Sequence, residues 1–74
     1  MLEVNGMKNL RKLRRDAAMS QFALAKATTI HRWRISHAEL GMLELTPIEV
    51  AAIRKVLVDV SRRKSARVLA ELSA

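Results

Sequence analysis

The chain contains almost none of the residues and turns from which a β-sheet is built. It has no Tyr, one Phe and one Trp, and its Asn5-Gly6 pair lies at the N-terminus rather than between two alternating apolar runs. Aromatic and β-branched residues favour strands, and an Asn-Gly pair between two such runs is a strong hairpin signal. Helix-favouring Ala, Leu, Arg, Lys, Glu and Met are abundant instead. The sequence therefore predicts an all-α fold.

Start and stop signals place the first three helices. We expect Asn5 to cap the first helix and Ser20 to cap the second, because short polar side chains accept hydrogen bonds from free helical N–H groups. The β-branched pair Thr28-Thr29 should end the second helix. A third helix is expected from about residue 31 to 40, with Gly41 as its stop.

The C-terminal part allows two interpretations. Thr46 followed by Pro47 predicts the start of a fourth helix. Residues 58–74 are then either an extension of that helix or a fifth helix capped by Asp59 or Ser61. The expected fold is therefore a compact all-α domain of four or five helices over residues 1–74.

Apolar residues at helical spacing predict the core and a further contact surface. The C-terminal part has more apolar residues at this spacing than a four-helix core needs, and we expect part of this stripe to meet a second copy of the chain. The stripe consists of Val56, Val60, Val68, Leu69 and Leu72. The predicted core consists of Leu10, Leu13, Phe22, Leu24, Ala25, Ile30, Ile35, Val50, Ile53 and Leu57.

The net charge of +7 is unevenly distributed. Residues 8–34 carry eight basic side chains and one acidic one, whereas residues 35–74 carry six basic and five acidic ones. Such asymmetry indicates a polyanionic partner, although a basic face can also serve only solubility. The absence of Cys excludes disulfides and thiolate metal sites.

The chain shows no sign of membrane insertion or export. It has no run of about 18 apolar residues and no early basic segment followed by an apolar one. We therefore expect a cytoplasmic protein without a membrane partner.

A helix, a short break and a second short helix is the geometry that places a recognition helix in the major groove of DNA. Over about residues 8–57 the chain resembles the helix-turn-helix domains of phage repressor, Cro and Xre-type regulators, leaving 58–74 as a helical extension. The resemblance is carried by Leu13-Arg14, Ser20-Gln21-Phe22-Ala23-Leu24-Ala25-Lys26, Ile30, Ile35-Ser36 and Glu39-Leu40-Gly41.

The resemblance implies a lambda-repressor-like fold and sequence-specific binding of double-stranded DNA by a transcriptional regulator, most simply a repressor acting as a homodimer. It also implies a largely buried salt bridge between Arg14 and Glu39. The expected DNA-binding residues are Lys12, Ser20, Gln21, Lys26, His31, Arg32, Trp33, Arg34 and His37.

Side-chain chemistry agrees with several of these roles. Arg32 can donate two hydrogen bonds to guanine, the commonest base-specific contact. Lys12, Lys26 and Arg34 suit phosphates. Trp33 either packs on a thymine methyl or a sugar, or covers an apolar seam of the domain.

Three positions depart from the family pattern. Ala18 and Thr29 stand where the family often has Gly, and a positive φ is costly for residues with a side chain. Each of these turns therefore either avoids positive φ or is strained. Leu40 replaces a residue that is usually polar, which weakens an expected phosphate contact.

Other functions compete with DNA binding. The carboxylates are spread along the chain, the chain has no Cys nucleophile, and Ser36-His37 diverge around a helix, so we expect no enzyme activity and no cofactor or metal. The alternative is a small basic protein-interaction module, for example the antitoxin partner of a toxin, with weak or no DNA specificity. RNA binding through the same basic surface is a third possibility.

Overall fold

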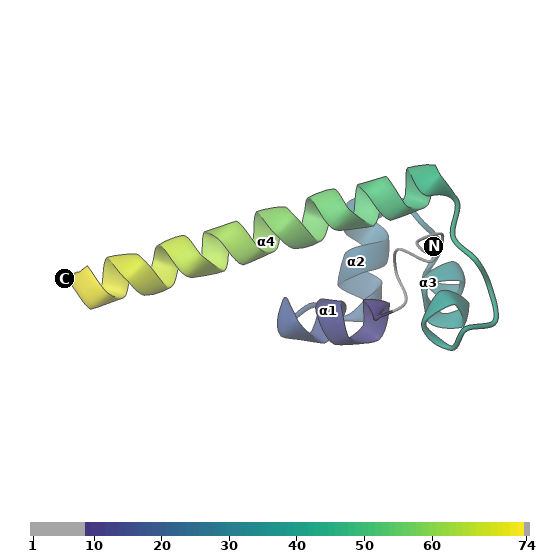
Figure 1. The fold of residues 1–74 in the computed structure, drawn as a ribbon, viewed down its shortest axis with the longest axis horizontal. Coiled ribbons are helices and arrows are strands. Elements are labelled where there is room, and N and C mark those ends of the chain that lie inside the picture. Colours follow the sequence, from purple (N-terminus) through teal and green to yellow (C-terminus); the bar gives the residue numbers. More distant parts are fainter. Residues whose placement is uncertain (1–8, 74) are drawn as a thin grey trace.

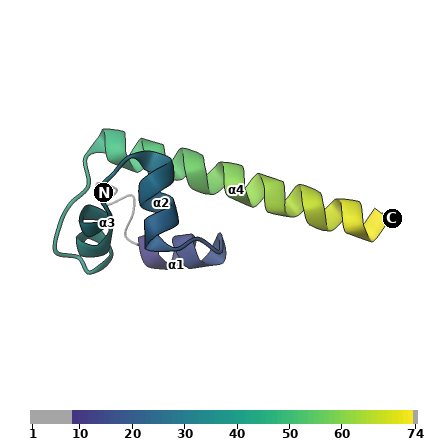
Figure 2. The same ribbon diagram turned by 180° about the vertical axis from the view of Figure 1, so that it is seen from behind.

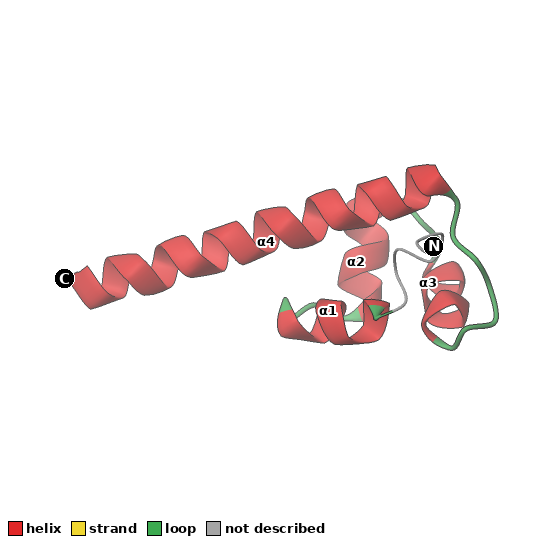
Figure 3. Ribbon diagram, viewed as in Figure 1, coloured by secondary structure: helices red, strands yellow, loops and turns green. Residues whose placement is uncertain are grey.

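The domain is all-α, as the sequence predicts. The computed structural model describes residues 9–73, which contain four helices and no strand. The expected cap Asn5 lies outside the described residues, and Asn9 occupies the cap position of the first helix. In chain order (Figures 1 and 3), the helices are α1 over Leu10–Asp16, α2 over Gln21–Thr28, α3 over Arg32–Glu39 and α4 over Pro47–Ser73.

The three short helices gather on one side of the first half of α4. In both views of the ribbon (Figures 1 and 2), α2 lies between α1 and α4. α2 packs against α3 and α4, and α1 contacts α3. Short helices of seven or eight residues are not stable alone, so this packing is what holds them.

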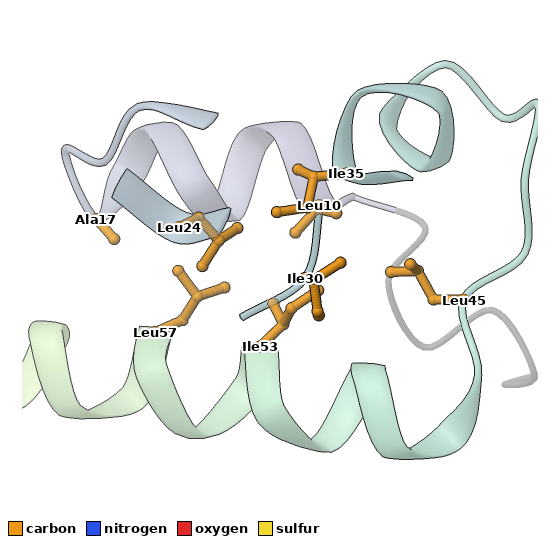
Figure 4. Close-up of a cluster of buried hydrophobic side chains, with 8 residues drawn as sticks. All are labelled: Leu10, Ala17, Leu24, Ile30, Ile35, Leu45, Ile53 and Leu57. Atoms are coloured by element: carbon orange, nitrogen blue, oxygen red, sulfur yellow. The ribbon is translucent and has the colours of Figure 1, made fainter. Parts of the chain in front are cut away.

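The core takes one fully buried side chain from each helix. Leu10, Leu24, Ile35 and Ile53 are each less than 2% exposed. Figure 4 shows Ile53 and Leu57 pointing from α4 towards the other helices. The remaining buried apolar side chains are Ala17, Ile30, Leu45 and Leu57.

The prediction that Phe22 and Leu13 belong to the core is wrong. Phe22 is 64% exposed, because it lies two residues from Leu24 and therefore on the opposite face of α2. Leu13 is 42% exposed, because it faces the edge of the domain below α4 rather than its centre. Of the other predicted members, Ala25 and Val50 are partly buried against the core.

α4 is one continuous helix of 27 residues, so residues 58–73 extend the fourth helix and form no fifth one. Asp59 and Ser61 lie inside it and cap nothing. No Gly or Pro follows Pro47, and the β-branched residues around Asp59 lower helix propensity by only tenths of a kcal/mol each.

The second half of α4 projects beyond the other helices (Figures 1 and 2). Every residue from 61 to 73 is exposed. The projection gives the described chain a longest dimension of 45 Å against a shortest of 19 Å. Within residues 9–73, no helix has both the length and the apolar character needed to cross a bilayer.

Candidate nucleic-acid interface

The helix-turn-helix expected from the sequence corresponds to α2, the turn after it and α3. Ser20 has extended backbone angles, and its hydroxyl accepts a hydrogen bond from the N–H of Ala23 at 2.9 Å, as expected of an N-cap. Leu24 anchors α2 in the core, while Lys26 is exposed. The start of α2 is thus set by its own N-cap, and Leu24 lies on the face that meets the core.

Three residues, Thr29 to His31, connect α2 to α3. The hydroxyl of Thr28 is buried and donates to the carbonyl of Leu24 at 2.7 Å. Ile30 is buried in the core and so ties the turn to α4. The turn is therefore held from within by one hydroxyl and one apolar side chain.

The two positions at which the family often has Gly both adopt the left-handed conformation. Ala18 has φ 58° and Thr29 has φ 59°. Such angles cost a residue with a Cβ roughly 1–2 kcal/mol, and β-branched residues are the least suited to them. The turns at Ala18, before α2, and at Thr29, after it, therefore do not avoid positive φ. The chain bears the strain of the left-handed conformation at both positions.

α3 presents opposite faces to the core and to solvent. Ile35 is fully buried, whereas Arg32 is exposed and Trp33 is 53% exposed. About half of the Trp33 surface is therefore open to a ligand. Gly41, with φ 77°, ends the helix, and the N–H groups of Gly41 and Met42 bond to the carbonyls of Ala38 and His37, as predicted for a glycine stop.

Three side chains form a small cluster on the solvent side of α3. The rings of Trp33 and His37 meet edge to face with centroids 5.6 Å apart. His37 Nδ1 lies 2.8 Å from the carbonyl oxygen of Trp33. The guanidinium of Arg34 lies 5.7 Å from the Trp33 ring centroid, within cation–π range. These contacts restrict the orientation of Trp33 before any ligand binds.

Arg14 and Glu39 form the expected ion pair between α1 and α3. Arg14 Nε lies 2.6 Å from Glu39 Oε2 and Nη2 lies 3.1 Å from Oε1, with side chains only 10% and 3% exposed. Arg14 Nη1 also donates to the carbonyl of Met19. Gln21 Nε2 donates to Glu39 Oε1 at 3.0 Å, so the first residue of α2 braces the end of α3.

This network keeps Glu39 ionised. Burial alone raises the pKa of Glu39, and the hydrogen bonds from Arg14 and Gln21 outweigh it, so that the pKa is lowered. A paired and hydrogen-bonded carboxylate is tolerated in the interior, but one that loses its partner is costly.

A second ion pair, which the sequence reasoning missed, attaches α3 to α4. Arg34 Nε and Nη2 donate to the two oxygens of Glu49 at 2.6 and 2.8 Å. Glu49 Oε1 also accepts from the N–H of Thr46, and the Thr46 hydroxyl accepts from the N–H of Glu49. The Thr46-x-x-Glu49 spacing is a capping box, which predicts the cap of α4 but not the pairing of Glu49 with Arg34.

Arg34, expected to contact a phosphate, is held by Glu49 within the domain. Two of its three nitrogens are used on Glu49, and these hydrogen bonds lower the pKa of Glu49 from 4.5 to about 2. Arg34 thus links α3 to the start of α4.

The other expected DNA-binding residues remain at the surface. Lys12 is exposed and pairs with Asp16 one turn along α1 at 3.0 Å. His31 occupies the N-cap position of α3, but its side chain makes no capping bond. Lys26 and Arg32 are exposed and have no ion-pair partner among residues 9–73. The structure thus brings Arg14, Gln21 and Glu39 together, and separately Trp33, Arg34 and His37.

The described part of the chain holds no group of three His, Asp or Glu side chains placed to bind a metal ion. Comparison with known protein families, with curated proteins and with solved structures finds no match to this chain. The site is therefore interpreted from its own geometry.

Proposed function

We propose that this chain binds double-stranded DNA in a sequence-specific manner and acts as a transcriptional regulator, most simply a repressor. The observation that carries the proposal is α3, a short helix whose inner face is fixed in the core and whose outer face exposes Arg32 and Trp33. A helix held in this way after a tight turn is suited to the major groove.

The rigidity of α3 supports the proposal. Arg14 holds its C-terminal end through Glu39, and Glu49 holds its first turn through Arg34. Base recognition requires side chains placed by a fixed backbone, because a bidentate contact tolerates little displacement.

The roles follow from exposure and free hydrogen-bonding groups. Arg32 has its whole guanidinium available for a guanine, and Trp33 offers an apolar surface to a thymine methyl or a sugar. Lys26, in the last turn of α2, and His31, at the N-cap of α3, suit phosphates. Gln21 and Arg34 act through the positions of α2 and α3.

The experiment is binding-site selection from random duplex DNA, followed by affinity measurements on variants. Arg32→Ala should weaken binding to the selected site by about 1–3 kcal/mol and relax the preference at one base pair. The matched control is Lys26→Ala, which should weaken binding to selected and random DNA equally and reduce the salt slope by about one unit.

The results of these measurements distinguish sequence-specific DNA binding from the competing functions. If Arg32→Ala weakens both DNAs by the same factor, Arg32 is a phosphate contact only. If the chain selects no sequence and Arg32→Ala changes nothing, the protein-interaction module becomes the better hypothesis, with a toxin among the partners to be tried. Preference for RNA over the same duplex sequence would favour the third function.

A homodimer goes with this proposal, because two half-sites are usually occupied by two copies. Of the stripe proposed for that contact, Val56 and Val60 pack against the core of their own chain. Val68 and Leu72 are exposed and remain available. Sedimentation of the wild type and of Leu72→Asp at high concentration tests the homodimer, since only the wild type should associate.

A further inference from the structure

A groove runs between α1 and the part of α4 that leaves the body of the domain. It has a volume of about 910 Å³, and Leu13 of α1 contributes to its lining. The rest of the lining comes mostly from one face of α4, since the α4 residues in it recur at steps of three and four. These residues are Arg54, Leu57, Val58, Ser61, Arg62, Ser65, Ala66 and Leu69.

The floor of this groove is apolar and open. Leu13, Val58 and Leu69 are 42%, 46% and 64% exposed, so much of their apolar surface faces solvent. Between Val58 and Leu69 the lining side chains include Ser61, Ser65 and Ala66, which are small and leave space for large side chains of a ligand. Adjacent exposed apolar side chains in a concave surface indicate an interaction site.

The rim of the groove is basic. Arg54 and Arg62 line it directly. The acidic residue in the lining, Asp16, is already paired with Lys12 at 3.0 Å. An apolar floor with basic edges is complementary to a helix with one apolar face and acidic flanks.

We propose that this groove binds an amphipathic helix of a partner protein, with apolar side chains on Leu13, Val58 and Leu69 and acidic side chains beside Arg54 and Arg62. A nucleic-acid backbone does not fit the apolar floor. A second copy docked in the groove through its own α4 would bring its basic residues 62–67 against the basic rim. The homodimer contact proposed above uses Val68 and Leu72, which lie outside the groove.

The test uses three labelled helical peptides and the full chain, followed by fluorescence anisotropy. All three carry Leu at i, i+3, i+4 and i+7, and their flanking positions are all Glu, all Lys or all Ser. The Glu peptide should bind at least about tenfold more tightly than the Lys peptide and lose affinity with added salt. In the double variant Arg54→Glu and Arg62→Glu this preference should invert.

A pair of matched variants locates the binding. Leu69→Ser should weaken the Glu peptide by about tenfold, because a buried leucine contributes that much. Leu40→Ser makes the same change at an equally exposed leucine outside the groove and should leave the affinity unchanged. Circular dichroism confirms that each variant is folded, and DNA binding plays no part in these measurements.

Three results overturn the proposal. The first is no binding of the Glu peptide, and the second is equal binding of the Glu and Lys peptides. The third is self-association of the chain that Leu69→Ser abolishes and Leu72→Asp does not, which would assign the groove to a second copy.

Discussion

The strained turn before α3 predicts that the domain becomes more stable when Thr29 is replaced by Gly. Thr29 has φ 59°, a left-handed angle that a β-branched residue adopts only at a cost. Its side chain is exposed, and its hydroxyl makes one short bond, to the carbonyl of the preceding Thr28 at 2.5 Å. The substitution therefore removes strain and almost no packing.

The size of the effect follows from two opposing contributions. Releasing the left-handed strain contributes roughly 1–2 kcal/mol. The greater freedom of Gly in the unfolded chain removes roughly 0.5–1 kcal/mol. The difference spans roughly 0–1.5 kcal/mol. We expect Thr29→Gly to lie in the middle of this range, at about 0.5–1 kcal/mol of added stability, which raises Tm by roughly 2–8 °C in a domain of this size.

Urea and thermal unfolding of Thr29→Gly measure this effect, and two control variants are unfolded in the same way. Ala27→Gly introduces the same residue at an exposed position inside α2, where it should cost about 1 kcal/mol. Thr29→Val keeps the β-branch and removes only the hydroxyl. It should leave the strain in place and gain nothing.

Loss of stability in Thr29→Gly, with Ala27→Gly behaving as expected, would refute the reasoning. A matching loss in Thr29→Val would then show that the hydroxyl bond to Thr28 outweighs the strain. If Thr29→Val is neutral, the left-handed angle is itself inexpensive in this turn.

Three further predictions concern the same framework. Ala18→Gly should also stabilise the domain, by less than Thr29→Gly because Ala is not β-branched, and the same unfolding experiments check it. Arg14→Met should cost about 3–5 kcal/mol by leaving Glu39 buried without its partner, and a double-mutant cycle with Glu39→Met should show strong coupling; independent effects would mean that the pair contributes nothing. Because the pKa of Glu49 is lowered from 4.5 to about 2, its pair with Arg34 stabilises the domain fully above about pH 4.5 and is lost as the pH falls from there to about 2. Denaturant midpoints at pH 7 and pH 3 should therefore differ less in Glu49→Gln than in the wild type, and equal differences in the two proteins would contradict this.

The helices and most of the core follow from the sequence because the signals that define them are local. Ser20 and Thr46 cap helices, Gly41 ends one, and Leu24 and Ile53 lie at helical spacing in the core, as predicted. Each of these depends on neighbours within about one turn of helix, and such neighbours are visible in a sequence.

The sequence-based predictions fail where tertiary packing decides which face of a helix is buried and which charged side chains pair. Phe22 and Leu13 are large apolar residues in helices, but the face of each helix that is buried depends on where its neighbours lie. The pairing of Arg34 with Glu49 joins two helices across a loop, so spacing along the chain gives no direct sign of it. The ion pair of Arg14 and Glu39 agrees with the family resemblance. The chemistry of the charged side chains alone does not single out these two residues.

Under the proposed function, the geometry of α3 predicts that DNA affinity depends on Glu39 and Glu49, whose ion pairs hold the helix. α3 has only eight residues, and one of them, Ile35, is fully buried, so the helix has little apolar contact to fix its rotation. The ion pairs of Glu39 and Arg34 supply the missing constraints at two points along the axis. A rigid link at one point alone leaves a short helix free to pivot, whereas links at two points fix its direction. Arg32 lies beyond both links at the start of α3, so a small change in that direction displaces its guanidinium most.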